Sequence, residues 1–219
     1  MVELVVFLGN PGRQYEHNRH NVGWLFAEYL PLCASCFWQK KYKGLYASAE
    51  IPAAAAVTAA VAGSPRKLHL LKPETFMNDS GEAIAAAAVF FKIKPESILV
   101  VHDELELPLG LVSLKFAGGL GGHNGLRSTK ACLGTADFWR LRFGIGRPDS
   151  RLPGEGGPPG SGKGIVEWVL SDFSAAEDRA LEQIFAAAAP AFVQALAQGP
   201  ETLLPEWGKK KVSLEFIPQ

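Results

Sequence analysis

The chain has 219 residues, of which 47% are hydrophobic, so it can bury a substantial core and is expected to form a single domain. Its 22 lysine and arginine residues balance 22 aspartate and glutamate residues. This balance excludes a protein that is basic as a whole, so a polyanionic partner would have to bind a local basic strip.

Cysteine usage and apolar segment lengths indicate the compartment. The chain has three cysteines. Cys33 and Cys36 have the spacing of half a zinc or redox motif, but Cys132 is isolated and no matching second pair exists, which favours incidental thiols. The apolar run at residues 1–8 is too short for a signal peptide, and the alanine-rich run at 53–62 is far short of the roughly 20 residues of a membrane helix. We therefore expect a reduced, cytoplasmic protein without a membrane segment.

Apolar runs separated by turn residues predict strands and helices in the first part of the chain. Residues 2–8 form a β-branched run that ends at a Gly-Asn-Pro-Gly turn, as expected for a central strand. Asn21 can cap a helix that stops near Pro31. Shorter strands are predicted at 42–51, 55–62 and 67–71.

The second part of the chain continues the alternation. Ser80 can cap a helix in which Ile84, Ala88 and Phe91 recur at helical spacing, and the apolar strand 98–101 follows. Further strands are predicted at 111–116 and 138–145, and helices at 124–132 and 174–198. Residues 147–164 are too rich in glycine and proline to pack regularly, so a mobile loop is expected there. The alternation predicts an α/β fold.

Five polar residues lie in segments that otherwise read as turns after apolar strands: Asn10, His20, Asn78, Asp103 and Asn124. Open α/β sheets collect ligand sites at the carboxyl ends of their strands. A histidine and a carboxylate can activate water, and asparagine amides can hold a neutral carbonyl. Although each of these residues alone is typical of an ordinary turn, the set predicts hydrolysis.

His20 is the first candidate for the general base, because a neutral imidazole can take a proton from water near neutral pH. Asp103 could accept the other imidazole N–H and fix the tautomer. His102 and His123 compete for the same role. We expect His102 to belong to a buried strand end, and His123 to support the site or contact substrate.

Three other patterns suggest chemistry that the sequence supports less well. The glycine-rich loop 118–125 lets backbone approach a ligand closely, although a flexible crossover loop has the same composition. Residues 157–164 imitate a phosphate-binding loop, but Gly164 stands where magnesium binding needs Ser or Thr. Asp103, Glu104 and Glu106 could ligate magnesium only if neighbouring side chains converged. We therefore predict no metal and no cofactor.

Five segments, in this order, resemble the signature blocks of bacterial-type peptidyl-tRNA hydrolase: LGNPGRQYEHNRHNVG, LKPETFMNDSG, VVHDELELPLG, KFAGGLGGHNGLRS and RLRFGIGRP. The similarity covers most of residues 1–148, with weaker support from VEWVLSDFS further on. Single blocks are suggestive, whereas the ordered set is highly specific.

The resemblance implies a monomeric α/β enzyme, with a mixed twisted sheet surrounded by helices, that cleaves the ester between a peptide and the 3′ ribose of tRNA without a metal. It implies that His20 is the catalytic base and that Asp103 orients it. The amides of Asn10, Asn78 and Asn124 would hold the peptide or the attacking water, with Tyr15, Met77 and His123 nearby in the substrate channel.

The resemblance also implies a tRNA-binding strip. Lys115 and Arg142 are similar to the family pair that clamps the tRNA 5′ phosphate, and Arg127 and Lys130 could extend the strip. Ser113 departs from the family at a position that is often basic, which puts tRNA affinity in doubt. A binding module for RNA without catalysis and a metal- or nucleotide-dependent hydrolase remain the alternative classes.

Overall fold

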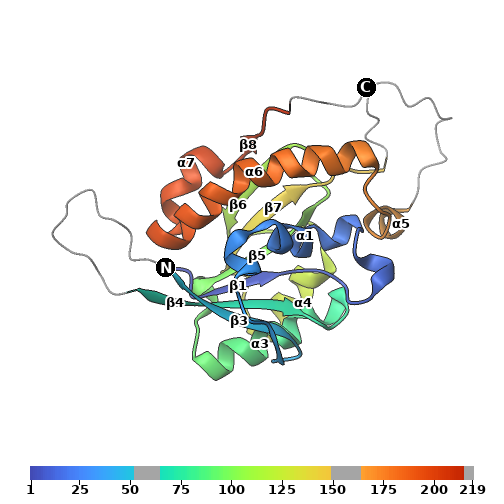
Figure 1. Ribbon diagram of the computed structural model, residues 1–219. Helices are drawn as coiled ribbons and strands as arrows, with labels where there is room; N and C mark the ends of the chain where they lie inside the picture. The colour runs from blue at the N-terminus through green and yellow to red at the C-terminus, as the bar shows by residue number, and fades with distance from the viewer. Residues whose placement is uncertain (52–64, 149–163, 215–219) are drawn as a thin grey trace.

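One eight-stranded sheet forms the centre of the computed structural model, which describes residues 1–51, 65–148 and 164–214 (Figure 1). The strand order is β2-β3-β4-β1-β5-β7-β6-β8. The strands are β1 (Leu4–Phe7), β2 (Gln39–Lys41), β3 (Gly44–Ile51), β4 (Arg66–Pro73), β5 (Ile98–Glu104), β6 (Leu111–Phe116), β7 (Trp139–Gly144) and β8 (Lys210–Lys211).

The four middle strands are parallel and the outer strands are antiparallel. β1 pairs in parallel with β4 and β5, and β5 pairs in parallel with β7. β2, β3, β6 and β8 join through antiparallel pairs. The carboxyl ends of β4, β1, β5 and β7 therefore meet at one edge of the sheet, where loops can bring side chains together.

Helices cover both faces, because the buried strands are apolar on both sides. In β1, Val5 and Phe7 belong to one core, and Leu4 and Val6 belong to the other. The first core lies under α1 (Val22–Tyr29), α6 (Ala175–Gln198) and α7 (Leu204–Trp207), and the second under α3 (Ser80–Phe91) and α4 (Asn124–Leu133) (Figure 1). Two short helices, α2 (Pro31–Ala34) and α5 (Ile165–Val169), and five 3₁₀ turns complete the described fold: η1 (Arg13–Tyr15), η2 (Arg19–Asn21), η3 (Met77–Asp79), η4 (Pro95–Ser97) and η5 (Pro200–Leu203).

By length and composition, α6 is the one helix in the described part of the chain that could cross a membrane. Its first turn is fixed by a capping box, in which Ser174 and Glu177 exchange hydrogen bonds with each other's backbone. Its residues Leu181, Ile184 and Phe192 are buried against the sheet. The helix is thus packed as a core helix.

The α/β fold with a mixed sheet is confirmed, and all but one of the predicted strands and helices are present within a few residues of their expected bounds. The exception, the strand at 55–62, lies outside the described residues, as do residues 149–163 of the predicted loop. Two predicted helix caps were wrong. The Asn21 side chain bonds to Asn10 instead, and Ser80 donates to the Met77 carbonyl. β2, β8, α5 and α7 were not predicted, because elements of two to five residues have little periodicity.

Candidate active site

The carboxyl ends of three neighbouring parallel strands supply the predicted site residues. Asn10 lies just beyond β1, Asp103 lies near the end of β5, and Asn78 is in η3, which follows β4. Asn124 begins α4, and His20 is in η2, just before α1. Gly23 allows this approach: a Cβ there would lie 2.6 Å from the Leu8 carbonyl oxygen, so α1 begins directly against the strand ends.

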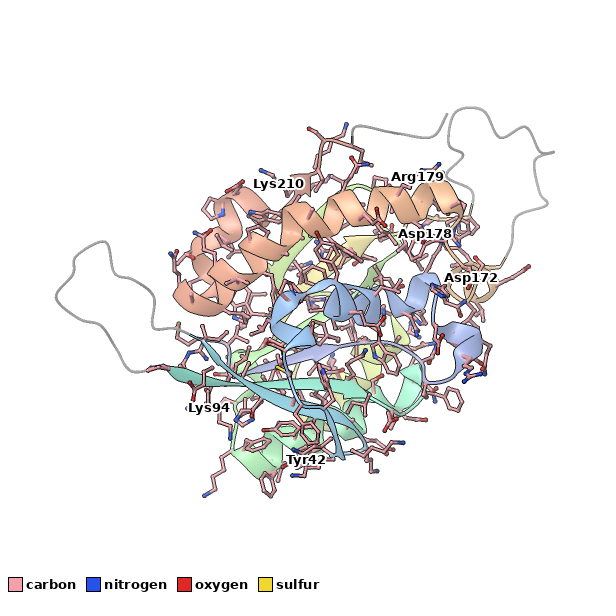
Figure 2. The ribbon with its side chains drawn as sticks, in the orientation of Figure 1. Tyr42, Lys94, Asp172, Asp178, Arg179 and Lys210 are labelled. Atoms are coloured by element: carbon pink, nitrogen blue, oxygen red, sulfur yellow. The ribbon has the colours of Figure 1, made fainter. Side chains whose placement is uncertain are left out.

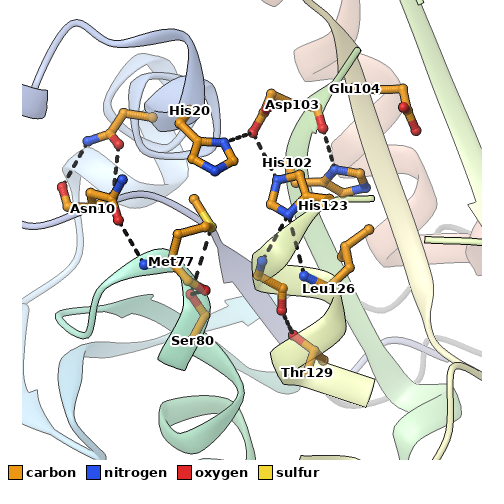
Figure 3. A network of polar contacts seen from close by, with 12 residues as sticks. Asn10, His20, Met77, Ser80, His102, Asp103, Glu104, His123, Leu126 and Thr129 are labelled. Carbon is orange, nitrogen blue, oxygen red and sulfur yellow. Dashed lines mark hydrogen bonds and ion pairs between the residues drawn. The ribbon is translucent and has the colours of Figure 1, made fainter. Parts of the chain in front are cut away.

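His20 and His123 both bind the same carboxylate oxygen. His20 Nδ1 lies 2.8 Å and His123 Nε2 lies 2.9 Å from Asp103 Oδ1, and the two ring centroids are 4.8 Å apart (Figure 3). Asp103 is 2% exposed and His20 is 8% exposed. The prediction that Asp103 meets His20 is therefore consistent with the geometry, although the two are 83 residues apart.

Hydrogen bonds assign the tautomers and separate the two imidazoles. His123 Nδ1 accepts the backbone N–H groups of Gly125 and Leu126 at 3.1 and 3.4 Å, so its proton is on Nε2, toward Asp103. Both of its nitrogens are therefore used within the protein. His20 donates from Nδ1 to Asp103, and its Nε2 has no partner among the described residues and is not sealed from solvent. Of these two imidazoles, only His20 can take a proton from an outside molecule without losing a hydrogen bond.

His102 is unsuited to the base role. Its Nδ1 donates to the Asp103 carbonyl at 2.6 Å, and its Nε2 is fully buried without a partner among the described residues (Figure 3). Burial and the adjacent His123 hold the pKa of His102 well below its ordinary value, so the ring stays neutral. The expectation that His102 belongs to a buried strand end is met.

Opposing influences set the protonation of the His20–Asp103 pair. Burial disfavours the charged imidazole most strongly, but the charge and hydrogen bond of Asp103 together outweigh it, so the pKa of His20 is raised. Burial also opposes ionisation of Asp103, yet the two histidines hold the pKa of Asp103 well below its usual range. Asp103 is thus a carboxylate near neutral pH.

The Asn10 amide is fixed in one orientation. Its Oδ1 accepts the Met77 backbone N–H at 2.7 Å, which leaves Nδ2 as a donor without a protein partner in the described residues (Figure 3). Asn21 holds the Asn10 backbone from the other side, with bonds of 2.8 Å to its N–H and 3.0 Å to its carbonyl. The Asn10 amide group is therefore preorganised for an acceptor.

The other predicted substrate contacts differ in exposure. Asn78 and Asn124 are exposed, and neither side chain has a partner among the described residues. Tyr15 is half-buried, with its ring edge-on to the exposed Phe76 at 6.4 Å. Met77 is buried, and its sulfur lies so close to α4 that a Cβ on Gly125 would be 2.6 Å from it.

The glycine-rich loop lies against charged side chains. Gly118, Gly121 and Gly122 have φ of 84°, 59° and 75°, a conformation that favours glycine. A Cβ on Gly118 would lie 3.4 Å from Lys115 Nζ, and one on Gly122 would lie 3.9 Å from an Arg127 nitrogen. The N–H groups of Gly125 and Leu126 bond to His123 Nδ1, so these two donors are not available to an anion.

The predicted basic strip lies on one face of the β6–β7 pair and on α4. Lys115 is opposite Arg140, and Ser113 is opposite Arg142. Arg142 binds Glu104 at 3.1 Å and the Ser113 hydroxyl at 2.7 Å, while Arg127 and Lys130 are exposed. Burial, together with Arg142 and Arg140, lowers the pKa of Lys115. Ser113 itself is buried, and its hydroxyl donates to the Gly208 carbonyl, so it supports Arg142 from inside the protein.

Sequence reasoning missed Arg140 and Arg19. Arg140 is 1% exposed, donates to the Gly119 carbonyl at 2.7 Å and has two further nitrogens that are buried without a partner in the described residues. Arg19 Nη2 donates to both carboxylate oxygens of Glu177. The alternation of faces along β7 could have placed Arg140 beside Arg142, whereas the Arg19 pair spans 158 residues and left no local signal.

One group of side chains in the described residues could hold a metal ion: His20, Asp103 and His123, whose ligand atoms lie within 4.8 Å of one another. The two nitrogens that face Asp103 carry protons, and both would have to lose them to become ligands. The acidic residues Asp103, Glu104 and Glu106 do not converge on one point, because Glu104 binds Arg142 while Asp103 binds the imidazoles.

The Cys33 thiol is not a nucleophile. Burial and the neighbouring Cys36 raise the pKa of this thiol to about 12, so it stays protonated.

These features define an α/β protein with an imidazole–carboxylate site at the carboxyl edge of a parallel sheet core. The family model described as peptidyl-tRNA hydrolase matches residues 4–214. Similar curated proteins are the peptidyl-tRNA hydrolases of Treponema pallidum, 44% identical with 96% of each chain covered, and of Marinobacter nauticus, 55% identical with 68% of this chain and 72% of the relative covered. The crystal structure of peptidyl-tRNA hydrolase from Acinetobacter baumannii is 31% identical, with a TM-score of 0.74 over 92% of this chain and 91% of that one. The chain belongs to the peptidyl-tRNA hydrolase family.

Proposed function

We propose that the protein hydrolyses the ester bond between an N-blocked peptide and the 3′ ribose of tRNA, and so recycles tRNA from aborted translation. We infer that it does so as a metal-independent, single-domain, cytoplasmic monomer. The observation that carries the proposed chemistry is the geometry of His20: Nδ1 is bound to Asp103 at 2.8 Å, and Nε2 is left without a partner in the described residues. This is the arrangement a general base needs.

In the proposed reaction, His20 Nε2 takes a proton from water as the water oxygen attacks the ester carbonyl carbon. The imidazolium is stabilised by the Asp103 carboxylate. When the carbonyl re-forms, the bond to the ribose 3′ oxygen breaks, and the proton passes from His20 to that oxygen. No covalent enzyme intermediate and no further reactant are needed.

The negative charge that develops on the carbonyl oxygen needs a fixed donor. We assign this role to Asn10, because its Oδ1 is held by the Met77 N–H and its amide nitrogen is left as a donor without a partner among the described residues. Asn78 and Asn124 are exposed amides suited to the peptide backbone of the substrate. Tyr15 and Met77 would flank the peptide, and His123 acts by holding Asp103 and the start of α4.

The tRNA is proposed to bind the basic strip through its phosphates. Lys115 and Arg142 are candidates for the 5′ phosphate, and Arg127 and Lys130 for the backbone further along. Lys115 and Arg142 lie beside Arg140, and among the described residues Glu104 is the one carboxylate that offsets these three cations, so a polyanion would gain net attraction.

The test compares hydrolysis of N-acetyl-aminoacyl-tRNA and of free aminoacyl-tRNA by the wild type and by His20→Ala. We expect preference for the blocked substrate, full activity in chelator, and a rate loss of roughly 10²–10⁴-fold for His20→Ala. Unchanged activity of His20→Ala would refute the assignment of the base. Loss of wild-type activity in chelator would instead indicate a metal-dependent hydrolase.

A further inference from the structure

Arg19, the residue before His20, binds the segment that enters α6. Its Nη2 donates to both carboxylate oxygens of Glu177, at 2.9 and 2.8 Å. Its Nη1 donates to the Ser171 hydroxyl at 2.7 Å and to the Asp172 carbonyl at 2.6 Å. The side chain is 6% exposed, so these charge-assisted bonds are shielded from water and from salt.

The guanidinium is also covered by an aromatic ring that connects it to the sheet. Its carbon lies 3.8 Å from the centre of the Trp168 ring. The Trp168 indole N–H donates to the Gly146 carbonyl at 2.9 Å, and the Gly146 N–H donates to the Leu107 carbonyl at 2.8 Å. Gly146 lies in the loop after β7 and Leu107 lies in the loop after β5. Arg19 is therefore connected to the end of the strand that carries Asp103.

The segment bound by Arg19 is itself held in place. Glu177 Oε2 also accepts the Ser174 backbone N–H at 2.7 Å, which closes the first turn of α6. Asp172, beside the start of that helix (Figure 2), accepts the Asn18 amide at 2.6 Å. The Arg19 backbone N–H donates to the Ser171 carbonyl at 3.1 Å. A rigid anchor is therefore present on the outer side of η2.

The other end of η2 is held by Asn21, which grips the Asn10 backbone on the opposite side of the turn. His20 lies between these two anchors. Its ring has one hydrogen bond within the described residues, the one to Asp103. The direction of the imidazole thus depends on how firmly the backbone of η2 is held.

We propose that Arg19 is a positioning residue: by binding the 168–177 segment, it holds η2 so that His20 Nδ1 stays within hydrogen-bond distance of Asp103. This inference rests on the proposed role of His20 as the base. Arg19 itself touches neither substrate nor water in the reaction. Its effect is transmitted through the His20–Asp103 bond.

The test uses Arg19→Ala in the full-length protein. We expect kcat to fall on the order of 10²-fold, as for a misplaced catalytic group, while KM changes little. The acid limb of the pH–rate profile should move to lower pH, because His20 loses contact with the carboxylate that raises its pKa while burial, which lowers it, remains. The downfield proton resonance of the His20 Nδ1–H should weaken.

A double-mutant cycle separates this role from general loss of stability. If Arg19 acts through the His20–Asp103 bond, Arg19→Ala should add little to the defect of Asp103→Asn. An equal loss in both backgrounds, with an unmoved pH limb and an intact resonance in the single variant, would overturn the proposal. A His20→Ala variant with unchanged activity would overturn the proposed function instead.

Two further variants keep the test decisive. Should Arg19→Ala fail to fold, Arg19→Lys keeps the charge and the stem but cannot bind Glu177 and the Ser171–Asp172 backbone through two separate nitrogens, and the same pH limb and resonance are read. Arg66→Ala is the matched control, since Arg66 donates to the carbonyls of Val2 and Leu196 and likewise ties the sheet to α6, away from the site. Arg66→Ala should lower stability without moving the pH limb.

Discussion

The imidazole–carboxylate cluster and the basic strip are built in opposite ways. Asp103, His20 and His123 are largely buried and bind one another, so their directions are fixed before any ligand arrives. In the strip, Arg142 is held by Glu104 and Ser113, but Arg127 and Lys130 are exposed and Lys115 is partly exposed. Fixed dipoles suit a transition state, whereas exposed cations attract a polyanion over a distance and are screened by salt.

This contrast predicts different kinetic consequences for mutations in the two regions. Changes in the cluster should lower kcat and move the pH profile. Changes in the strip should raise KM and make kcat/KM less dependent on salt, while kcat is preserved. A strip variant that lowered kcat alone, or a cluster variant that changed only the salt dependence, would break the distinction.

The largest effect in this comparison is expected for Asp103→Asn. The rate should fall by roughly 10²–10⁴-fold, because the imidazolium loses its counter-charge. With the carboxylate gone, burial remains as the main influence on His20, so its pKa should fall and the acid limb should move to lower pH. The pH dependence of kcat/KM measures both effects, and an acid limb that moved upward would contradict the assignment.

The same substitution should alter acid stability. The pKa of Asp103 is lowered in the folded protein, so its contribution to the free energy of unfolding is present above the unfolded value of 3.8 and is lost as pH falls through the folded value. Asp103→Asn should remove this part of the acid dependence. Urea titrations that extend from neutral pH to well below 3.8 would detect the difference.

The sequence predicted features that depend on local pattern, but not those that depend on contacts between distant residues. Continuous apolar runs such as β1 and β5 are visible from local pattern alone, and the resemblance placed His20 and Asp103 together. The residues alone ranked His20 first as the base but left His102 and His123 as competitors, because the distinction depends on which nitrogen is already bonded. That information resides in contacts such as His123 with the start of α4 and His20 with a strand 83 residues away.

Local rules failed where a distant partner was stronger. Asn21 satisfies the sequence rule for a helix cap, yet its amide holds Asn10 on the neighbouring loop. Ser113 reads as a lost cation, yet its hydroxyl lies inside the protein and supports Arg142. In both cases the pattern identified the position correctly, but its chemical role depends on a partner that sequence spacing does not specify.

A smaller effect is expected for Lys115→Ala. Loss of one partly exposed phosphate contact should raise KM about fivefold, equivalent to ~1 kcal/mol, with kcat unchanged. The slope of log(kcat/KM) against log[salt] should become shallower by about one unit. Lys94→Ala is the control, because this exposed lysine precedes β5 at the amino ends of the parallel strands, opposite the site (Figure 2). An equal effect of both variants would remove the evidence for a localised strip.

The smallest effects should come from α4, and they should differ along the helix. Arg127 lies next to Gly122 of the loop that also packs on Lys115, so it continues the strip. Lys130 is nearly one turn further along and close to the end of the helix, where a cation is also favoured by the helix dipole. We therefore expect Arg127→Ala to make the salt dependence of kcat/KM shallower by up to about one unit, and Lys130→Ala to change it less. The reverse order would mean that tRNA approaches along the exposed face of α4 instead of across the glycine-rich loop.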